Sequence, residues 1–224
     1  MAPAQSTDWS GLSPQLLDGA RQMGLAVSPT QAAQLLAYLA CLERWNGVHS
    51  LSAWTRPTDL MVQHVLDSMT LVGPLERFAQ GRPLRILDAG SGPGFPAAVL
   101  AAMRPEWHVT AVDAVAKKVA FVRQAAAEAA IGNLVATHSR LEGFHPPRLF
   151  DVAVSRAFAS LQRFAVVTEH LIGATGVWVA QKGQVPVDEL RRLGKVVEVF
   201  HVEHVTVPGL AAERNLVWMR RADR

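Results

Sequence analysis

The sequence contains little cysteine and little charge, and it lacks a long apolar run. Cys41 is the only cysteine, so an internal disulfide and a cysteine-based zinc site are excluded, and we expect a reducing, cytoplasmic compartment. No apolar run reaches membrane-spanning length, and the first residues lack the basic and apolar segments of a signal peptide. We therefore expect no membrane partner.

The composition that remains is that of a folded protein. Charged residues make up 18% of the 224 residues, too few for a disordered chain, and half of the residues are hydrophobic. The length suits one sizeable α/β domain with an appendage. The formal net charge of +3 is compatible with an anionic partner but does not require one.

The first part of the chain shows only helical patterns. Ser13 and Ser28 each precede a proline and are candidate N-cap residues of two helices. A third helical stretch follows Pro57. Residues 1–80 are therefore predicted to form an N-terminal helical cap that belongs to the same compact unit as the rest.

From about residue 81, short apolar strands alternate with helices. Strands are expected at 84–87, 109–112, 134–137, 151–154 and 177–180, and helices at 96–103, at 115–130 and from about 161. Two further candidate strands, 196–207 and 216–219, are joined by a loop and would form an antiparallel edge. Residues 81–224 are thus predicted to form a mainly parallel, seven-stranded sheet covered by helices on both faces.

A glycine-rich turn lies between the first strand and the helix after it. Gly90, Gly92 and Gly94 follow the pattern Gly-x-Gly-x-Gly, whereas a dinucleotide fingerprint has its third glycine where Phe95 stands. No Lys-Ser/Thr pair follows, so a P-loop is not indicated. The turn favours a ligand without a phosphate, although a turn that only packs a helix on a strand is the alternative.

Two acidic residues frame this turn. Asp88 precedes the turn and could face the ammonium of an amino-acid-like ligand. Asp113 ends the second strand, where an acid pairs with ribose hydroxyls. A ribose and an ammonium without a diphosphate describe S-adenosylmethionine. The expected contacts of this cofactor therefore include Asp88, Gly90, Gly92, Gly94 and Asp113.

Polar residues follow four predicted strands at the rim of the sheet where open α/β sheets bind ligands. Arg140, Leu141 and Glu142 follow the third strand, and Arg156 follows the fourth. Leu141 and Phe95 could sandwich an adenine, and Glu142 could bind its edge. Surface ion pairs of Arg140 and Glu142, and a surface charge at Arg156, are the alternatives.

Several segments, in this order and spacing, are similar to one known family: Leu42–Asn46, His64–Ser68, Leu87–Pro96, Asp113 with Lys117 and Lys118, Ser139–Glu142, Ser155–Ala159 and Lys182–Gly183. They resemble the RsmG family, also called glucose-inhibited division protein B, over about residues 35–185. The resemblance implies a Rossmann-like class I methyltransferase that uses S-adenosylmethionine to methylate N7 of a guanine in 16S ribosomal RNA. It also implies cofactor contacts at Gly90, Phe95, Leu141, Glu142 and Arg156.

The chain departs from this family at two places. It has Ser50-Leu51-Ser52 where the family usually has Asn-Leu-Thr, and Ala97 where a glycine commonly follows the proline. Neither change touches the glycine turn. The first leaves the contribution of the N-terminal helices open.

The residues exclude several other methyl-transfer chemistries. Methylation of a pyrimidine at C5 needs a cysteine nucleophile, and Cys41 lies on a predicted helix well before the sheet. Methylation of an exocyclic amine typically uses Asn/Asp-Pro-Pro-aromatic after the fourth strand, where this chain has Ser155–Phe158. Metal-dependent O-methylation would need a cluster of carboxylates, and the sequence has none. His201 and His204 are expected on opposite faces of a strand, so they are not expected to bind a metal together. Guanine N7 carries a free lone pair, so we expect alignment alone and no catalytic base.

Basic residues around the predicted site could bind RNA phosphates, with solvated surface as the alternative for each: Lys117, Lys118, Arg123, Arg140, Arg156, Lys182 and Arg214. Trp45 could stack on a base, but its spacing favours a place in the core. His64 and Asp67 lie one helical turn apart and could form a structural hydrogen bond or cap the site.

The sequence therefore predicts a methyltransferase that acts on 16S ribosomal RNA or the small ribosomal subunit, as a monomer and without a metal. One alternative is a methyltransferase that acts on a small molecule or a protein. Another is a non-catalytic, cofactor-binding ribosome assembly factor.

Overall fold

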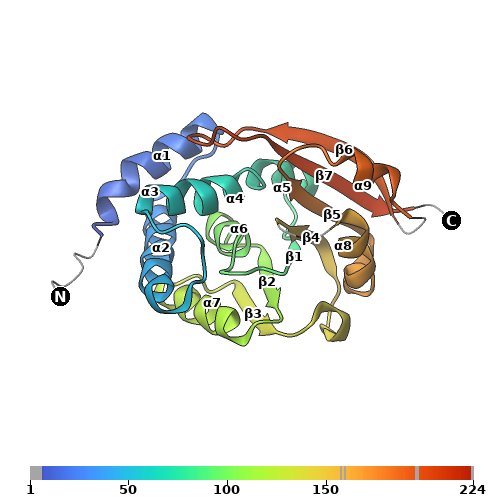
Figure 1. Ribbon diagram of the computed structural model, residues 1–224, viewed down its shortest axis with the longest axis horizontal. Helices are drawn as coiled ribbons and strands as arrows, with labels where there is room; N and C mark the ends of the chain where they lie inside the picture. The colour runs from blue at the N-terminus through green and yellow to red at the C-terminus, as the bar shows by residue number, and fades with distance from the viewer. Residues whose placement is uncertain (1–6, 157, 159, 195–196, 223–224) are drawn as a thin grey trace.

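The computed structural model describes residues 7–156, 158, 160–194 and 197–222. Its centre is a seven-stranded sheet of order β3-β2-β1-β4-β5-β7-β6, flanked by helices (Figure 1). The strands are β1 (Arg85–Ala89), β2 (His108–Asp113), β3 (Leu134–His138), β4 (Phe150–Ser155), β5 (Ile172–Lys182), β6 (Val197–Val205) and β7 (Arg214–Arg221).

Strands β1 to β5 pair in parallel, whereas β7 runs antiparallel to both β5 and β6. The predicted antiparallel edge is thus confirmed. The last strand of the chain, β7, lies between β5 and β6, and β6 forms the edge of the sheet. Strand β5 begins at Ile172, earlier than the predicted 177, and Val196 of the predicted tail strand lies outside the described residues. Both faces of β4 are buried after Asp151, which explains its continuous apolar sequence.

The order of the strands reverses between β1 and β4. Strand β1 pairs with β2 on one side and with β4 on the other. In open α/β sheets, ligands bind beyond the carboxyl ends of the strands at such a reversal. Residues that follow Ala89 of β1 and Ser155 of β4 therefore meet at the expected binding position.

The helical segments are η1 (Ser10–Leu12), α1 (Ser13–Gln22), α2 (Pro29–His49), α3 (Pro57–Leu60), η2 (Met61–Leu66), α4 (Asp67–Met69), α5 (Val72–Ala79), α6 (Ala97–Met103), α7 (Ala116–Glu128), η3 (Leu141–Gly143), α8 (Leu161–Thr168), η4 (Glu169–Leu171) and α9 (Val187–Arg191). None of the described helices is long and apolar enough to cross a membrane.

One of the two predicted N-caps is confirmed. Ser28 accepts a hydrogen bond from the Gln31 amide, and the Gln31 side chain accepts one from the Ser28 amide, so α2 begins with a capping box. The prediction for Ser13 was wrong. The turn η1 runs directly into α1, and the Ser13 amide already donates to the Ser10 carbonyl, so Ser13 is the first helical residue and not its cap.

The third helical stretch is continuous from Pro57 to Met69 but changes its winding. Its middle part, η2, is π-helical, and the backbone stays helical where η2 meets α3 and α4. A π-helical turn rotates the side chains relative to a regular α-helix. His64 of η2 and Asp67 of α4 are buried and take part in the site described below.

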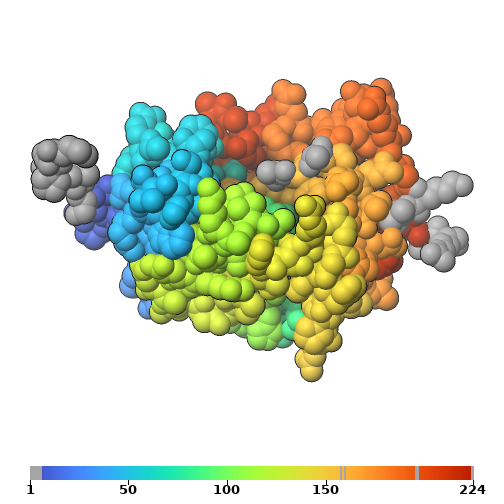
Figure 2. Space-filling view, turned by 60° about the horizontal axis from the view of Figure 1, so that its bottom comes forward, coloured from blue at the N-terminus to red at the C-terminus, as the bar shows by residue number. Residues whose placement is uncertain are grey.

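The N-terminal helices share a hydrophobic core with one face of the sheet. One apolar cluster contains Leu39 of α2, Val65 of η2 and Ile86 of β1. Neighbouring residues of β1, Leu87 and Ala89, belong to a second cluster with α8 on the opposite face. Figure 2 shows the blue surface of the N-terminal helices directly bordering the yellow-green surface of the segment that carries α7.

Candidate functional site

The three glycines of the turn after β1 all have positive φ angles, +70°, +57° and +82°, but they face different surroundings. A Cβ at Gly92 would meet nothing within 4 Å, and a Cβ at Gly90 would meet only the Phe158 ring at 3.9 Å. A Cβ at Gly94 would collide with the Tyr38 hydroxyl. Gly90 and Gly92 therefore leave room for a ligand, whereas Gly94 lets the turn pack against α2.

Asp113 at the end of β2 holds the glycine turn in place. Its Oδ2 atom accepts a hydrogen bond from the Gly92 amide at 2.9 Å, and its Oδ1 atom accepts one from the Val115 amide at 2.8 Å. On the other side of the turn, the Tyr38 hydroxyl donates to the Pro93 carbonyl at 3.0 Å. The turn is thus fixed from β2 and from α2 together.

Asp88, which the sequence suggests could face the ammonium of a ligand, lies buried beneath the glycine turn. Its side chain is buried, it lines neither of the cavities described next, and its Oδ2 atom accepts a hydrogen bond from the Ala97 amide at 3.0 Å. Burial raises the pKa of this carboxyl to about 7. Asp88 therefore stabilises the first turn of α6 from beneath the glycine turn, because the chain folds back over the end of β1.

Two cavities meet at Gly90. We call the first the β2–β3 cavity, because residues at or just after the ends of these two strands line it: Asp113, Ala114, Ser139, Arg140, Leu141 and Glu142, together with Gly90, Val112, Phe158, Arg163 and Val167. We call the second the β4–β5 cavity. It is lined by Trp54, Gln63, His64, Asp67, Gly90–Pro93, Phe95, Lys118, Arg156, Gln181, Lys182, Gly183 and Arg214. The polar ends of four strands thus gather at one rim, as the sequence predicts.

Leu141 and Phe95, which the sequence suggests could sandwich an adenine, line different cavities. Leu141 lines the β2–β3 cavity, whereas Phe95 lines the β4–β5 cavity. The Phe95 ring is 3% exposed and stacks on the His64 ring with 4.7 Å between the ring centroids. Phe158 is the aromatic residue that shares a cavity with Leu141, and sequence reasoning missed it. Its place directly after the polar end of β4 was the available signal.

Arg156 lies in a buried network and not on the surface. Its Nε atom donates to the Phe95 carbonyl at 3.1 Å, and its Nη1 atom donates to the Gln63 carbonyl at 3.0 Å and to Asp67 at 3.3 Å. Burial lowers the pKa of Arg156. The guanidinium therefore joins β4 to the glycine turn and to the N-terminal helices.

Asp67 is the carboxylate that compensates this buried charge. Its Oδ1 atom also accepts hydrogen bonds from Arg214 Nε at 2.7 Å and from Gln181 Nε2 at 3.1 Å. Arg214 begins β7, and Gln181 lies near the end of β5. One side chain from the N-terminal helices thus connects three strands at the rim of the sheet.

His64 is neutral and hydrogen-bonded at both ring nitrogens. Burial and the Arg156 guanidinium lower its pKa to about 3. Its Nδ1 atom lies 3.3 Å from Arg156 Nη2 and accepts that hydrogen, so Nε2 carries the proton and donates to Ser52 Oγ at 2.8 Å. His64 and Asp67 thus both accept hydrogen bonds from the Arg156 guanidinium. These contacts replace the hydrogen bond that we expected between the two side chains.

The predicted basic residues divide into two groups. Those that line the two cavities are Lys118, Arg140, Arg156, Lys182 and Arg214. Lys117 and Arg123 line neither cavity. Lys117 Nζ donates to the His49 carbonyl at the end of α2, and Arg123 Nε donates to the Ala136 carbonyl of β3. Lys182 is paired with Glu189 at 3.1 Å.

Two other side chains singled out in the sequence, Trp45 and Cys41, are half-buried or buried. Trp45 is half-buried and packs against Phe121, as its spacing predicts. Cys41 is buried, and burial raises the pKa of its thiol to about 11, so it is not a nucleophile. Within the described residues, no group of three or more His, Cys, Asp or Glu side chains could hold a metal ion.

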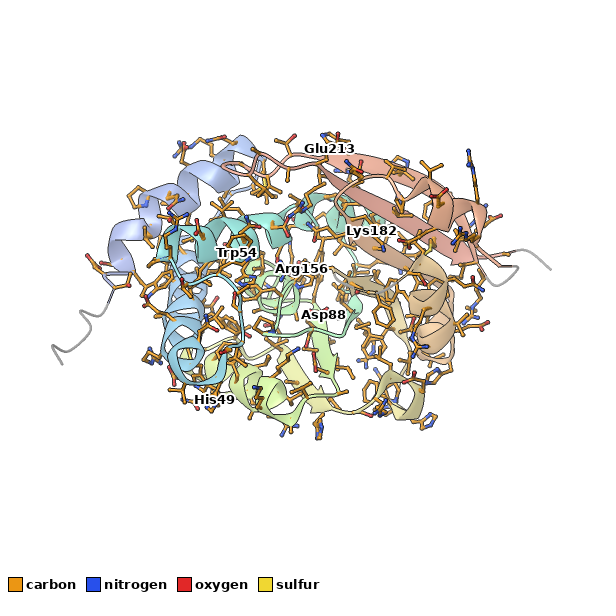
Figure 3. The ribbon with its side chains drawn as sticks, in the orientation of Figure 1. His49, Trp54, Asp88, Arg156, Lys182 and Glu213 are labelled. Atoms are coloured by element: carbon orange, nitrogen blue, oxygen red, sulfur yellow. The ribbon has the colours of Figure 1, made fainter. Side chains whose placement is uncertain are left out.

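Trp54 is a second residue that sequence reasoning missed. It lies in the loop between α2 and α3, lines the β4–β5 cavity and is 42% exposed. Figure 3 shows Arg156 between Trp54 and Lys182, with Asp88 below it in this view. A tryptophan in a loop between helical stretches was the available signal.

Comparisons with known proteins agree on one family. A family model described as "GidB: rRNA small subunit methyltransferase G" matches residues 31–217. "Ribosomal RNA small subunit methyltransferase G" of Leptothrix cholodnii is 48% identical over 205 residues, which are 92% of this chain and 94% of that protein. The protein of the same name from Methylibium petroleiphilum is 44% identical over 214 residues, 96% of each chain.

Solved structures with low sequence identity share the fold. The ribosomal protein L11 methylase of Lactobacillus delbrueckii subsp. bulgaricus is 15% identical, with a TM-score of 0.55 over 70% of this chain and 79% of that chain. The N-methyltransferase NodS of Bradyrhizobium japonicum is 11% identical, with a TM-score of 0.53 over 70% and 97% of the two chains. These neighbours are methyltransferases, so the predicted Rossmann-like methyltransferase fold is confirmed.

Proposed function

Because the chain belongs to the rRNA small subunit methyltransferase G family, we propose that it transfers a methyl group from S-adenosylmethionine to N7 of a guanine in 16S ribosomal RNA. The observation that carries this proposal is the meeting of the two cavities at Gly90. One cavity has the residues expected to hold a nucleoside, and basic side chains line the other cavity, where the proposal places the RNA.

The residues at the junction fit the cofactor. Gly90 and Gly92 leave open the space that a Cβ would occupy, and the Asp113 carboxylate lines the adjoining cavity. In this proposal Asp113 binds the ribose, Leu141 and Phe158 enclose the adenine, and Glu142 binds its edge. When bound, the cofactor supplies an electrophilic methyl group on a sulfonium centre.

The remaining predicted contacts have supporting roles in this arrangement. Gly94 and Asp88 keep the turn and α6 in position, as their contacts with Tyr38 and Ala97 indicate. Arg156 holds the turn through the Phe95 carbonyl. These residues shape the end of the cofactor site next to the β4–β5 cavity.

The reaction requires no proton transfer by the protein. Guanine N7 has a free lone pair, so the protein must align it and exclude water. His64, the histidine that lines the β4–β5 cavity, is neutral and hydrogen-bonded at both ring nitrogens, which leaves it no role as a base. The contacts of the cavity therefore support catalysis by positioning.

We assign RNA contacts to basic residues at the rim. Lys118, Arg140 and Lys182 line the cavities, and Lys117 lies on the adjoining first turn of α7. Phosphate contacts of this kind give affinity without sequence specificity and weaken as salt increases. In this proposal the protein acts as a monomer, without a metal, on 16S ribosomal RNA or the small subunit in the cytoplasm.

The proposal is tested with labelled S-adenosylmethionine and small subunits from cells that lack the protein. Digestion of the RNA and identification of the nucleosides by mass should give labelled 7-methylguanosine. Gly90→Asp should abolish the label, because its side chain would occupy the junction of the cavities. The same assay with Phe200→Ala, an exposed aromatic on β6, should keep it.

Other outcomes would support the alternatives. Cofactor binding with no label in any RNA would overturn the ribosomal substrate. Label in a protein or a small molecule would then indicate the second substrate class. Binding of both cofactor and small subunits without any transfer would indicate an assembly factor.

A further inference from the structure

Trp54 lines the β4–β5 cavity, where the proposed function places the RNA, but neither the cofactor contacts nor the phosphate contacts involve it. Of the large hydrophobic side chains exposed in the described part of the chain, Trp54 is the one that lines either cavity. It shares the β4–β5 cavity with Gly92, Arg156 and Lys182 (Figure 3). An exposed indole at this position can offer a flat face to a ligand.

The backbone of Trp54 is fixed although its side chain is exposed. Its carbonyl accepts a hydrogen bond from Asn46 Nδ2 at 3.1 Å, and its amide donates to Ser52 Oγ at 3.1 Å. The Oδ1 atom of the same Asn46 accepts from the Ser52 amide at 2.8 Å. The loop between α2 and α3 is therefore held at three points, so that binding would order little further chain.

This loop is also connected to the buried network. Ser52 Oγ accepts the hydrogen bond of His64 Nε2, and His64 Nδ1 accepts one from Arg156. Arg156 in turn binds the Phe95 carbonyl at the end of the glycine turn. Trp54 is thus placed relative to the turn by a continuous chain of polar contacts.

The charged side chains of the β4–β5 cavity already have partners of opposite charge. Arg156 and Arg214 share Asp67, Lys182 pairs with Glu189, and Lys118 lies 3.8 Å from Asp113. A flat, uncharged base in this cavity gains little from such paired groups. Proteins that take a base out of its stack commonly hold it against an aromatic ring.

From these contacts, and resting on the proposed function, we propose that Trp54 is the platform on which the target guanine stacks. The reaction strengthens this interaction. N7 gives its lone pair to the new bond with carbon while the sulfonium sulfur recovers an electron pair and becomes neutral, so the positive charge passes to the guanine ring. An indole face attracts a cation and therefore stabilises the guanine as it becomes charged.

A binding measurement without turnover tests the platform. GMP and 7-methyl-GMP are added to the protein, and tryptophan fluorescence is recorded, with AMP as the control nucleotide. We expect quenching that is stronger for 7-methyl-GMP than for GMP and is lost in Trp54→Phe. Equal quenching in the wild-type protein and in Trp54→Phe would overturn the proposal, because another tryptophan would then be responsible.

Kinetics on small subunits provide the second test. Trp54→Ala should lower kcat/KM for the subunit by about 5- to 150-fold, the range for one lost base–aromatic stack, with an unchanged Kd for S-adenosylmethionine. Trp54→Phe should recover most of this loss. Phe200→Ala removes an equally exposed aromatic on β6, outside both cavities, and should match the wild-type protein.

Failure of the proposed function and failure of the Trp54 platform give different results. If the wild-type protein forms no 7-methylguanosine, the proposed function and the platform are both overturned. If the wild-type protein forms 7-methylguanosine and Trp54→Ala forms it with unchanged kcat/KM, only the platform is overturned.

Discussion

The two cavities that meet at Gly90 are built in different ways. Behind the β4–β5 cavity, Arg156 and Arg214 are bound to Asp67 in a buried network, and the carboxyl group of Asp67 is 7% exposed. Beside the β2–β3 cavity, Glu142 pairs with Arg163 while both side chains are more than half exposed. Buried ion pairs are costly to break, whereas exposed pairs contribute little. The first cavity should therefore depend on its charges for folding, and the second only for binding.

Removal of the shared carboxylate should have the largest effect. Asp67→Ala leaves the guanidinium groups of Arg156 and Arg214, whose side chains are 17% and 19% exposed, without their counter-charge, which should lower the free energy of unfolding by about 3–5 kcal/mol. Urea unfolding measures this loss. The control Glu198→Ala removes the partner of Arg220 in an exposed pair and should cost at most about 1 kcal/mol. Equal losses in the two variants would remove the distinction between the network around Asp67 and an exposed ion pair.

The glycine turn should show the same contrast within a few residues. Gly94→Ala places a Cβ against the Tyr38 hydroxyl at a positive φ, and should cost about 1–3 kcal/mol for the collision and about 1–2 kcal/mol for the backbone. Gly92→Ala meets no neighbour, so only the backbone cost of about 1–2 kcal/mol is expected.

Gly94→Ala should have the larger effect on stability, whereas Gly92→Ala should have the larger effect on cofactor binding. The added Cβ of Gly92→Ala enters the proposed cofactor space, so the Kd for S-adenosylmethionine should increase although the fold is less affected. Calorimetric titration alongside urea unfolding measures both effects. A Gly92→Ala variant that is as unstable as Gly94→Ala would contradict the assignment of open space at Gly92.

The pH dependence of stability should report the burial of His64. Its pKa falls from 6.5 to about 3 on folding, so between these values the unfolded chain binds a proton that the folded protein does not. The wild-type fold therefore loses stability from this group as pH falls through that window. His64→Gln should gain stability relative to wild type as pH falls below 6.5, on the order of 1 kcal/mol per pH unit.

Asp88 affects the dependence of the free energy of unfolding on pH in the opposite direction to His64. Burial raises its pKa from 3.8 to about 7, so its contribution is lost as pH rises through 7. It is present in both proteins and cancels in their difference. Urea unfolding of wild type and His64→Gln at several pH values is the measurement. A difference that stays constant between pH 7 and pH 5 would be incompatible with a buried, neutral His64.

The smallest effect on stability is expected at the exposed pair. Glu142→Ala should change the free energy of unfolding by roughly 0–1 kcal/mol. If Glu142 binds the adenine edge as proposed, the Kd for S-adenosylmethionine should nevertheless increase by about tenfold or more. An unchanged Kd would remove Glu142 from the cofactor site and leave it with only its contact to Arg163.

Much of the fold could be predicted because its signals are local. Short apolar segments that end in polar residues indicated the parallel strands, and the tail without a helix indicated the antiparallel edge. Parallel strands bring their carboxyl ends to one rim, so Gly90, Asp113, Leu141 and Arg156 could be placed together in advance. The glycine spacing was enough to favour a ligand without a phosphate.

The direction of individual side chains could not be predicted in this way. Asp88 and Phe95 lie next to the glycine turn in the sequence, but Asp88 turns towards α6 and Phe95 stacks on His64. Periodicity shows which face of an element a residue occupies, and these two residues lie where the chain leaves its regular elements. Packing against other segments decides their orientation.

The sequence by itself determined the family of the protein, its mainly parallel sheet and the position of the glycine turn at the rim of that sheet. Only the tertiary structure decided what surrounds the β4–β5 cavity. Asp67 and Arg156 are 89 residues apart, Asp67 and Arg214 are 147 apart, and Trp54 reaches the same cavity from a loop between two helices. Contacts at such separations depend on how the N-terminal helices and β7 pack on the sheet, and no local pattern in the sequence encodes that packing.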